Sequence, residues 1–225
     1  MAQSTNDVIP TAMRLATLAT LPSLLGAMDA LAEALLAKGD EFDDVIKSGR
    51  THLQDATPIR LGQEFAAYGR TVARHRQKLV EAADWLREMN IGGTAVGTGI
   101  NAEAEYPALM VDALSQVSGL DLREGDDRVQ LMQSMGDVAG FSGAVRAYVL
   151  DLNKIANDIR LLASGPRTGL AEILLPAVQP GSSIMPGKVN PSIAEMVNQV
   201  CYQALGLDTT VAMAAEAGQL ELNVM

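Results

Sequence analysis

The sequence predicts an all-α protein built as a bundle of long helices. Four stretches of the 225-residue chain carry apolar side chains at alternating three- and four-residue spacing, which places them along one face of a helix. No stretch of useful length alternates apolar and polar residues with the period of two that a strand requires. The composition is 48% hydrophobic and 20% charged, so the chain has enough apolar material for a buried core.

Each helix is predicted from its apolar series and from the residues at its ends. The first series runs from Leu18 to Leu35 and stops at Lys38 and Gly39, with an internal Pro22 that predicts a kink because it lacks an N–H donor. The second series starts with Thr57 as N-cap and Pro58 in the first turn, and it continues for about nine turns. The remaining predicted helices are a short one near 102–117, a long one over 131–159 and a fourth from Pro191 toward the C-terminus.

Composition excludes several classes of function. A formal net charge of −10 argues against a general nucleic-acid-binding protein, which normally presents a basic face. A single cysteine, Cys201, excludes an internal disulfide framework and favours the cytoplasm; it lies on an apolar helical stretch, as a packed thiol does. The apolar segment 15–28 is short for a membrane span, and the N-terminus lacks the pattern of a signal peptide. No His, Cys or Asp cluster has the spacing of metal ligands, so neither a metal site nor another cofactor is expected.

The loop from Gly181 to Pro191 is the strongest candidate for chemistry. It contains two hydroxyls, Ser182 and Ser183, and the cation of Lys188, and it leads into a helix start with Asn190 as the predicted N-cap. A helix N-terminus beside a lysine attracts anions, and the glycines of the loop allow it to close over a ligand. The competing interpretation is an ordinary connector between two helices.

Three further segments need an interpretation. Gly49–Pro58 places His52 beside Thr51 just before a predicted helix, where a histidine can carry a proton, although the segment by itself favours a surface histidine without a role. Gln3–Asp7 offers hydroxyl and amide groups at another helix start, and by itself it reads as a cap. Gly92–Asn101 lacks the lysine and the strand context of a phosphate-binding loop, so we expect a tight connection between helices. The only other histidine, His75, falls on an apolar stripe and is expected to be packed.

Taken together, three of these segments resemble the signature regions of the aspartase/fumarase superfamily. They are Gly181–Pro191, the sequence Gly-Arg-Thr-His-Leu-Gln-Asp-Ala at 49–56 and Gln3–Asp7, and they occur in the order and at the separations typical of the superfamily. The resemblance implies a small dicarboxylate substrate and a homotetramer in which long helices form a common bundle and each active site draws on three subunits. It also implies that the chain, 1–225, is the central helical-bundle domain, without the N-terminal and C-terminal domains of the superfamily.

The resemblance assigns a role to each matching residue. Ser182 would be the base that removes a proton from the carbon next to a carboxylate, with Lys188 and Asn190 holding that carboxylate as it becomes a dianion. Ser183 would be a substrate ligand. Glu195 would orient His52 and raise its pKa. The leaving group and the second carboxylate would be bound by His52 and a further group of residues, namely Thr51, Ser4, Thr5 and Asn6.

Within the superfamily, Ser4-Thr5 and the segments 197–201 and 214–220 look more like the ammonia-lyase members. The implied reaction is the reversible deamination of L-aspartate to fumarate and ammonia. Hydration of fumarate to malate is the first alternative. A non-catalytic helical scaffold, like the crystallins that resemble this superfamily, is the second, although the joint presence of Ser182, Lys188, Asn190 and His52 argues against it.

Overall fold

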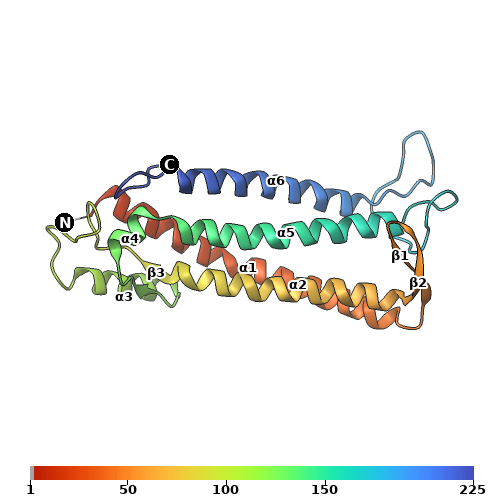
Figure 1. The fold of residues 1–225 in the computed structure, drawn as a ribbon, viewed down its shortest axis with the longest axis horizontal. Coiled ribbons are helices and arrows are strands. Elements are labelled where there is room, and N and C mark those ends of the chain that lie inside the picture. The colour runs from red at the N-terminus through yellow and green to blue at the C-terminus, as the bar shows by residue number, and fades with distance from the viewer. Residues whose placement is uncertain (1–2) are drawn as a thin grey trace. The chain divides into compact units, whose positions relative to one another are not determined.

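The computed structural model describes residues 3–225, and most of these residues are helical (Figure 1), which confirms the predicted all-α class. In chain order the elements are α1 Thr5–Glu41, β1 Ile46–Thr51, β2 Gln54–Arg60, α2 Leu61–Asp84, a 3-10 turn η1 Trp85–Arg87, β3 Glu88–Met89, α3 Tyr106–Ser118, β4 Arg123–Glu124, α4 Arg128–Gln133, α5 Gly136–Leu162 and α6 Ser192–Glu216. The strands form two small pairs, β1 antiparallel to β2 and β3 parallel to β4.

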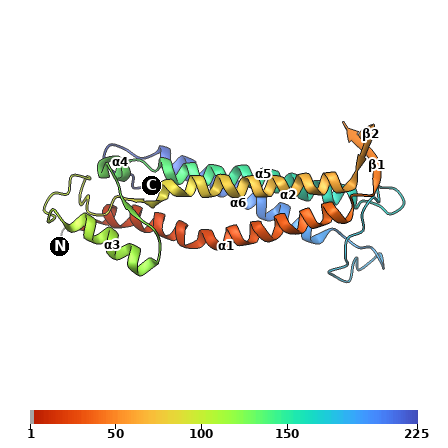
Figure 2. The same cartoon turned by 90° about the horizontal axis from the view of Figure 1, so that it is seen from below.

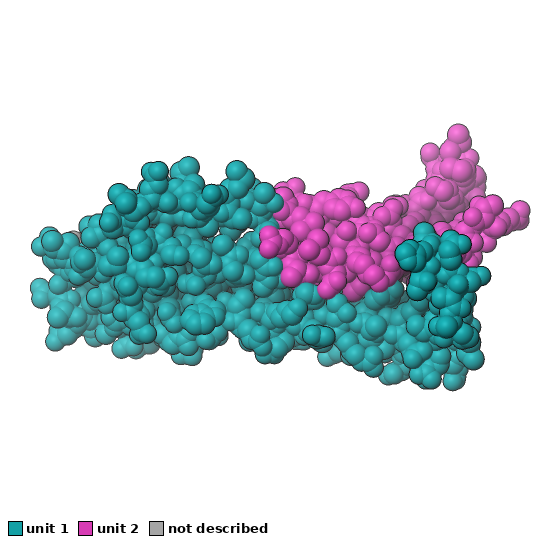
Figure 3. Space-filling view, viewed as in Figure 1, with its two compact units in different colours: residues 1–145, 208–225 teal, residues 146–207 magenta. Residues whose placement is uncertain are grey.

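The chain divides into two compact units. Unit 1 runs to Val145 and resumes at Asp208, and unit 2 spans Arg146–Leu207 (Figure 3). The helices α5 and α6 each contribute residues to both units. Unit 1 holds the N-terminus of α1 and the β1–β2 hairpin, whereas unit 2 holds the loop that precedes α6.

The core of unit 1 forms where α1 and α2 run side by side (Figure 2). The predicted apolar stripes are the buried faces of both helices, because a three- and four-residue spacing keeps side chains on one side of a helix. The helices pack tightly near their connection, where a Cβ on Gly62 would lie 2.2 Å from the carbonyl oxygen of Gly39. His75 is buried on the α2 stripe, as predicted.

The predicted start of the second long helix is wrong. Thr57 and Pro58 belong to β2, and α2 begins only at Leu61, where the Gln63 side chain accepts the backbone N–H of Arg60 at 3.0 Å. The hairpin turns at His52 and Leu53, whose φ angles of 53° and 61° are both left-handed, as in a two-residue turn of type I′. β1 is mostly half-buried and β2 largely exposed, so neither strand shows apolar alternation. The turn lacks glycine and asparagine, so the usual hairpin signals are missing.

Other boundaries also differ from the predictions. The long helix expected over 131–159 is interrupted after Gln133, where α4 ends, and α5 begins at Gly136. The short helix starts at Tyr106, later than expected, because Asn101 adopts a left-handed φ of 62° within the preceding turns. The fourth helix, α6, starts at Ser192, which moves Pro191 out of the first helical turn. The apolar segment 15–28 was too short for a membrane span, but the whole of α1 is long and apolar enough to cross a membrane. Core helices of soluble proteins meet the same criterion.

Candidate functional site

The first candidate cluster, Ser4, Thr5 and Asn6, lies at the N-terminus of α1. Ser4 occupies the N-cap position in an extended conformation, but its side chain makes no capping hydrogen bond. Its carbonyl oxygen instead accepts the backbone N–H groups of Asp7 and Val8, both at 3.1 Å. The Nδ2 atom of Asn6 is buried and has no hydrogen-bond partner among residues 3–225. The Asn6 amide, which lacks an internal partner, and the Ser4 hydroxyl, which forms no cap, are suited to binding a ligand.

Asn6 also lines a cavity of about 270 Å³ within unit 1. Most of the cavity wall is apolar and comes from α1, the segment around Met135 and the residues that follow Val211, including Val224. A polar amide on an apolar wall provides a directional contact for a small polar ligand.

The second candidate cluster, Thr51 and His52, lies at the tip of the β1–β2 hairpin. Both side chains are exposed, and the His52 carbonyl oxygen accepts a bond of 3.4 Å from the side chain of Gln54. His52 has a positive φ although it is not a glycine, a conformation that costs energy and occurs often at functional sites. The turn therefore presents the imidazole away from the α1–α2 core.

The first two clusters lie at opposite ends of unit 1 (Figures 1 and 2). The helix α1, which separates them, has 37 residues, and at 1.5 Å per residue it is about 55 Å long. A single copy of unit 1 therefore does not bring Asn6 and His52 together around one small ligand.

The third candidate cluster lies on the loop between α5 and α6, in unit 2. The Oγ atom of Ser182 accepts two backbone N–H groups, from Met185 at 3.2 Å and from Ile184 at 3.4 Å. The loop folds back on itself at Gly181, which has a φ of +88° and whose added Cβ would lie 2.6 Å from the carbonyl oxygen of Lys188. Only glycine fits this position without a change in the loop. Ser183 and Lys188 are exposed.

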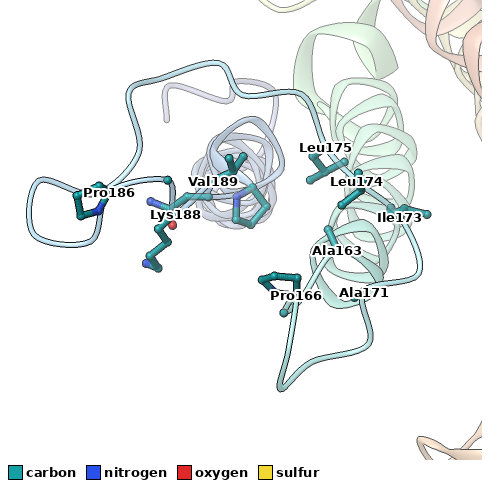
Figure 4. A pocket seen from close by; sticks show the side chains of 13 residues that line it. Ala163, Pro166, Ala171, Ile173, Leu174, Leu175, Pro186, Lys188 and Val189 are labelled. Carbon is teal, nitrogen blue, oxygen red and sulfur yellow. The ribbon is translucent and has the colours of Figure 1, made fainter.

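Lys188 and Asn190 line a pocket of about 530 Å³ within unit 2 (Figure 4). Figure 4 shows Pro186, Lys188 and Val189 on one side of the pocket and the segment after α5, from Ala163 to Leu175, on the other. The wall combines apolar side chains with one cation, which suits a small anion with a hydrocarbon part. Ser182 and Ser183 belong to the same loop but not to the lining of this pocket.

Glu195 lies in the first turn of α6, where it faces an arginine that the sequence did not single out. Its Oε1 is 3.8 Å from Nη2 of Arg160. Nη1 of Arg160 donates to Oδ1 of the buried Asn198 at 2.9 Å, and Nδ2 of Asn198 donates to Oδ1 of Asn153 at 2.7 Å. Within unit 2, Glu195 thus belongs to a polar network that ties α5 to α6, whereas its pairing with His52 remains a prediction. The only sequence signal for Arg160 was its position directly after Ile159, the last residue of the predicted apolar stripe.

Asp7 is the second residue that sequence reasoning left without a role. It is fully buried, and burial raises the pKa of its carboxyl above the usual value. The backbone amides of Gly92, Thr94 and Gly93 and the charge of Arg128 oppose this shift in pKa, because they favour the ionised form. Across residues 3–225, no group of three or more His, Cys, Asp or Glu side chains is arranged to hold a metal ion.

Known proteins resemble this chain over its whole length. The sequence model of a family described as "Lyase" matches residues 1–206. The aspartate ammonia-lyase of Bacillus subtilis is 53% identical over 225 residues, which cover 100% of this chain and 47% of that protein. The chain therefore spans about half the length of the curated relatives that it matches.

Solved structures agree with the sequence comparisons. A crystal structure named "fumarate lyase:delta crystallin" from Brucella melitensis superposes with a TM-score of 0.97 at 56% identity, covering 100% of this chain and 49% of that one. A class II fumarase from Schistosoma mansoni superposes with a TM-score of 0.95 at 36% identity, covering 99% and 50%. The chain therefore belongs to the lyase family, within the aspartase/fumarase superfamily that its three polar clusters resemble.

Proposed function

We propose that this chain supplies the catalytic residues of an aspartate ammonia-lyase, which converts L-aspartate to fumarate and ammonia. A base removes a proton from the carbon next to one carboxylate, the electron pair forms the C=C bond, and the C–N bond breaks as ammonia leaves. Before the nitrogen leaves, that carboxylate carries a second negative charge. Most of the catalytic effect therefore has to come from groups that stabilise negative charge.

The observation that carries the proposal is the environment of Ser182. A serine hydroxyl is a weak acid, so it acts as a base only where its surroundings stabilise the alkoxide. Its Oγ already accepts the backbone N–H groups of Ile184 and Met185, and these bonds become stronger when the oxygen is charged. Lys188, on the same loop, adds a full positive charge to the pocket that Asn190 also lines. These contacts support Ser182 as the base and Lys188 with Asn190 as the groups that hold the reacting carboxylate.

The other two clusters are proposed to bind the rest of the substrate. Ser4, Thr5 and Asn6, with the Asn6 amide unpaired within the described chain, would hold the second carboxylate. Thr51 and His52 at the hairpin tip would bind the leaving group, with Glu195 orienting His52. Ser183, next to the base, would be a ligand of the substrate.

A site that includes both Asn6 and His52 requires more than one copy of the chain, because α1 separates them by about 55 Å. We propose a homotetramer in which each site combines clusters from different subunits. The exposed apolar side chains of α6 support this assembly, since Ile193, Met196, Val200 and Leu207 recur at helical spacing on a face that the single chain leaves open.

The substrate is inferred from the relatives. A relative that is 53% identical is named an aspartate ammonia-lyase, whereas the class II fumarase is 36% identical. Deamination is therefore favoured over hydration of fumarate. Location in the cytoplasm also remains a proposal, supported by the single, buried cysteine.

The decisive experiment compares the two neighbouring serines in the intact protein. Fumarate formation is followed by its ultraviolet absorbance, with aspartate and malate offered separately. We expect activity with aspartate, and we expect Ser182→Ala to lower kcat by about a thousandfold or more with little change in substrate binding, because the loss is confined to the transition state. Ser183→Ala is the matched control and should mainly raise KM.

Two results would contradict the proposal. Activity with malate alone would assign the reaction to a hydratase. If Ser183→Ala were inactive while Ser182→Ala kept near-normal turnover, Ser183 and not Ser182 would be the base.

A further inference from the structure

The glycine-rich segment Gly92–Asn101 folds as a series of tight turns beside the N-terminus of α1. Gly93 donates its backbone N–H to the carbonyl oxygen of Asn90 at 3.0 Å, and Gly97 and Gly99 donate to Gly93 at 2.9 and 3.1 Å. Gly92 has a φ of +95°, and an added Cβ would lie 2.6 Å from Cγ of Pro107. The segment is thus a compact turn of fixed shape, and none of the proposed catalytic steps uses it.

This turn binds α1 through Asp7. The backbone N–H of Gly92 donates to Oδ2 of Asp7 at 3.2 Å, and Nδ2 of Asn90 donates to the backbone carbonyl oxygen of Asp7 at 3.0 Å. The Thr11 hydroxyl lies within hydrogen-bond distance of the same carbonyl oxygen, at 2.9 Å, and of Oδ1 of Asn90, at 3.1 Å. All of these bonds are buried, and Asp7 itself has 0% exposure. Both the side chain and the backbone of Asp7 are therefore attached to residues more than 80 positions away in sequence.

The attachment anchors a helix start that lacks its usual side-chain cap. The first N–H groups of a helix lack partners within it, and an N-cap serine usually satisfies one of them with its side chain. Ser4 occupies that position here but makes no such bond. The bonds from Asp7 to Gly92 and Asn90 do not satisfy these N–H groups, but they attach the first turn of α1 to the Gly92–Asn101 segment and its neighbour Asn90.

We propose that Asp7 is a positioning residue for the substrate-binding cluster at the start of α1. Its carboxylate, bound to Gly92, fixes the first helical turn and so holds Ser4, Thr5 and Asn6 in place for the second carboxylate of the substrate. This inference rests on the proposed function of that cluster. It also gives the Gly92–Asn101 segment a role, since Gly92 in this fixed turn donates the hydrogen bond to Asp7.

The test compares three variants of the intact protein by hydrogen exchange and by kinetics. Asp7→Ala removes the acceptor for Gly92. Asp7→Asn keeps an oxygen of nearly the same size and position. Thr11→Val, the matched control, removes a buried hydroxyl from the same network one helical turn later and leaves the bond between Asp7 and Gly92 intact.

We expect Asp7→Ala to speed amide exchange in residues 4–9 about tenfold, while the middle of α1 keeps its protection. The same variant should raise KM for aspartate about tenfold with a much smaller change in kcat, because ground-state and transition-state binding are weakened alike. Asp7→Asn should restore most of the protection and most of the affinity. Thr11→Val should lower the melting temperature without changing KM.

Specific outcomes overturn the inference. Unchanged exchange in residues 4–9 of a folded Asp7→Ala protein would show that Asp7 does not hold the turn. Faster exchange with an unchanged KM, or an equal rise of KM in Thr11→Val, would show that the bond does not serve the cluster. If Asp7→Ala does not fold, Asp7→Glu takes its place, because the extra methylene displaces the carboxylate. We then expect the same faster exchange in residues 4–9 and the same rise in KM.

A wrong proposed function can be told apart from a wrong role for Asp7. The unmodified protein would then form no fumarate from aspartate. In that case the exchange measurement still decides whether Asp7 fixes the turn, and the kinetic arm is replaced by the affinity for fumarate measured by calorimetry. A tenfold loss of that affinity in Asp7→Ala alone supports the positioning role, and an unchanged affinity overturns it.

Discussion

The pKa of the Asp7 carboxyl is subject to two opposing effects. Burial disfavours the charged form, while the amides of Gly92, Thr94 and Gly93 and the guanidinium of Arg128 favour it. Burial is the largest of these effects, so the folded-state pKa lies above the value of about 3.9 expected for the unfolded chain. The other buried charge near this region, Arg14, is paired with Asp137 at 3.7 Å.

A raised pKa in the folded state predicts a definite dependence of stability on pH. The stabilisation from the protonated form of Asp7 is fully present below the unfolded pKa, and it is lost as the pH rises through the folded pKa. Asp7→Asn does not titrate and lacks this loss. We therefore expect the melting temperature of Asp7→Asn, relative to that of the unmodified protein, to increase as the pH is raised from 4 toward neutrality. Differential scanning calorimetry at several pH values measures this difference, and a decrease with pH would mean that the amides and Arg128 outweigh burial.

At the scale of elements, the pair α1 and α2 provides the main core of unit 1, and α2 offers a matched comparison of two neighbouring positions. Leu79 is fully buried, with 0% exposure, whereas Val80 is 37% exposed. Leu79→Ala should lower the free energy of unfolding by about 2–5 kcal/mol, because it removes packed methyl groups and leaves a cavity. Val80→Ala should cost less than about 1 kcal/mol. Urea denaturation of both variants checks the prediction, and equal losses would mean that the stripe is not the buried face.

The sequence predicted buried elements better than exposed ones, because burial requires apolar side chains at regular spacing. The stripes of α1 and α2 were predictable because Leu79 and its neighbours at helical spacing have to be apolar. The β1–β2 hairpin was not, since neither strand has a fully buried face and its turn uses His52 and Leu53 rather than glycine. The break after Gln133 was missed because the apolar spacing continues across it, although Asp127, which accepts the N–H groups of Val129 and Gln130, marked the start of a separate short helix.

In the candidate site, local sequence patterns could be recognised, whereas contacts between distant residues could not. Polar residues at helix starts and in glycine-containing loops identified Ser4, His52 and Ser182 as positions of interest. The bond between Asp7 and Gly92 was not predictable, because it joins residues 85 positions apart and neither one departs from a local pattern. The partner of Glu195, Arg160, was also hidden, since it lies on a different helix.

At the scale of the whole molecule, the proposed composite site makes a quantitative prediction about mixtures. Asn6→Ala and His52→Asn should each inactivate the enzyme, because each removes a proposed contact to the substrate. If a site takes these residues from different chains, random exchange of subunits leaves roughly a quarter of the sites with both residues intact. Mixing the two inactive proteins under conditions of subunit exchange should therefore restore about that share of activity. Mixing two differently tagged Asn6→Ala proteins is the control for exchange.

The same proteins test the assembly itself. Sedimentation velocity should give a tetramer for the unmodified protein and for both variants. A folded monomer with full activity would contradict the composite site, and so would verified subunit exchange without any recovery of activity.

The length of α1 also has a consequence for the order of events during biosynthesis. A newly made chain carries Asn6 at one end of the long helix α1 and His52 beyond the other, so on the proposed mechanism it folds without acquiring a working centre. With the proposed composite site, catalysis would begin only when copies meet, at the last step of maturation. Nascent or orphan chains would then not consume aspartate, and turnover would start once their concentration is high enough for assembly.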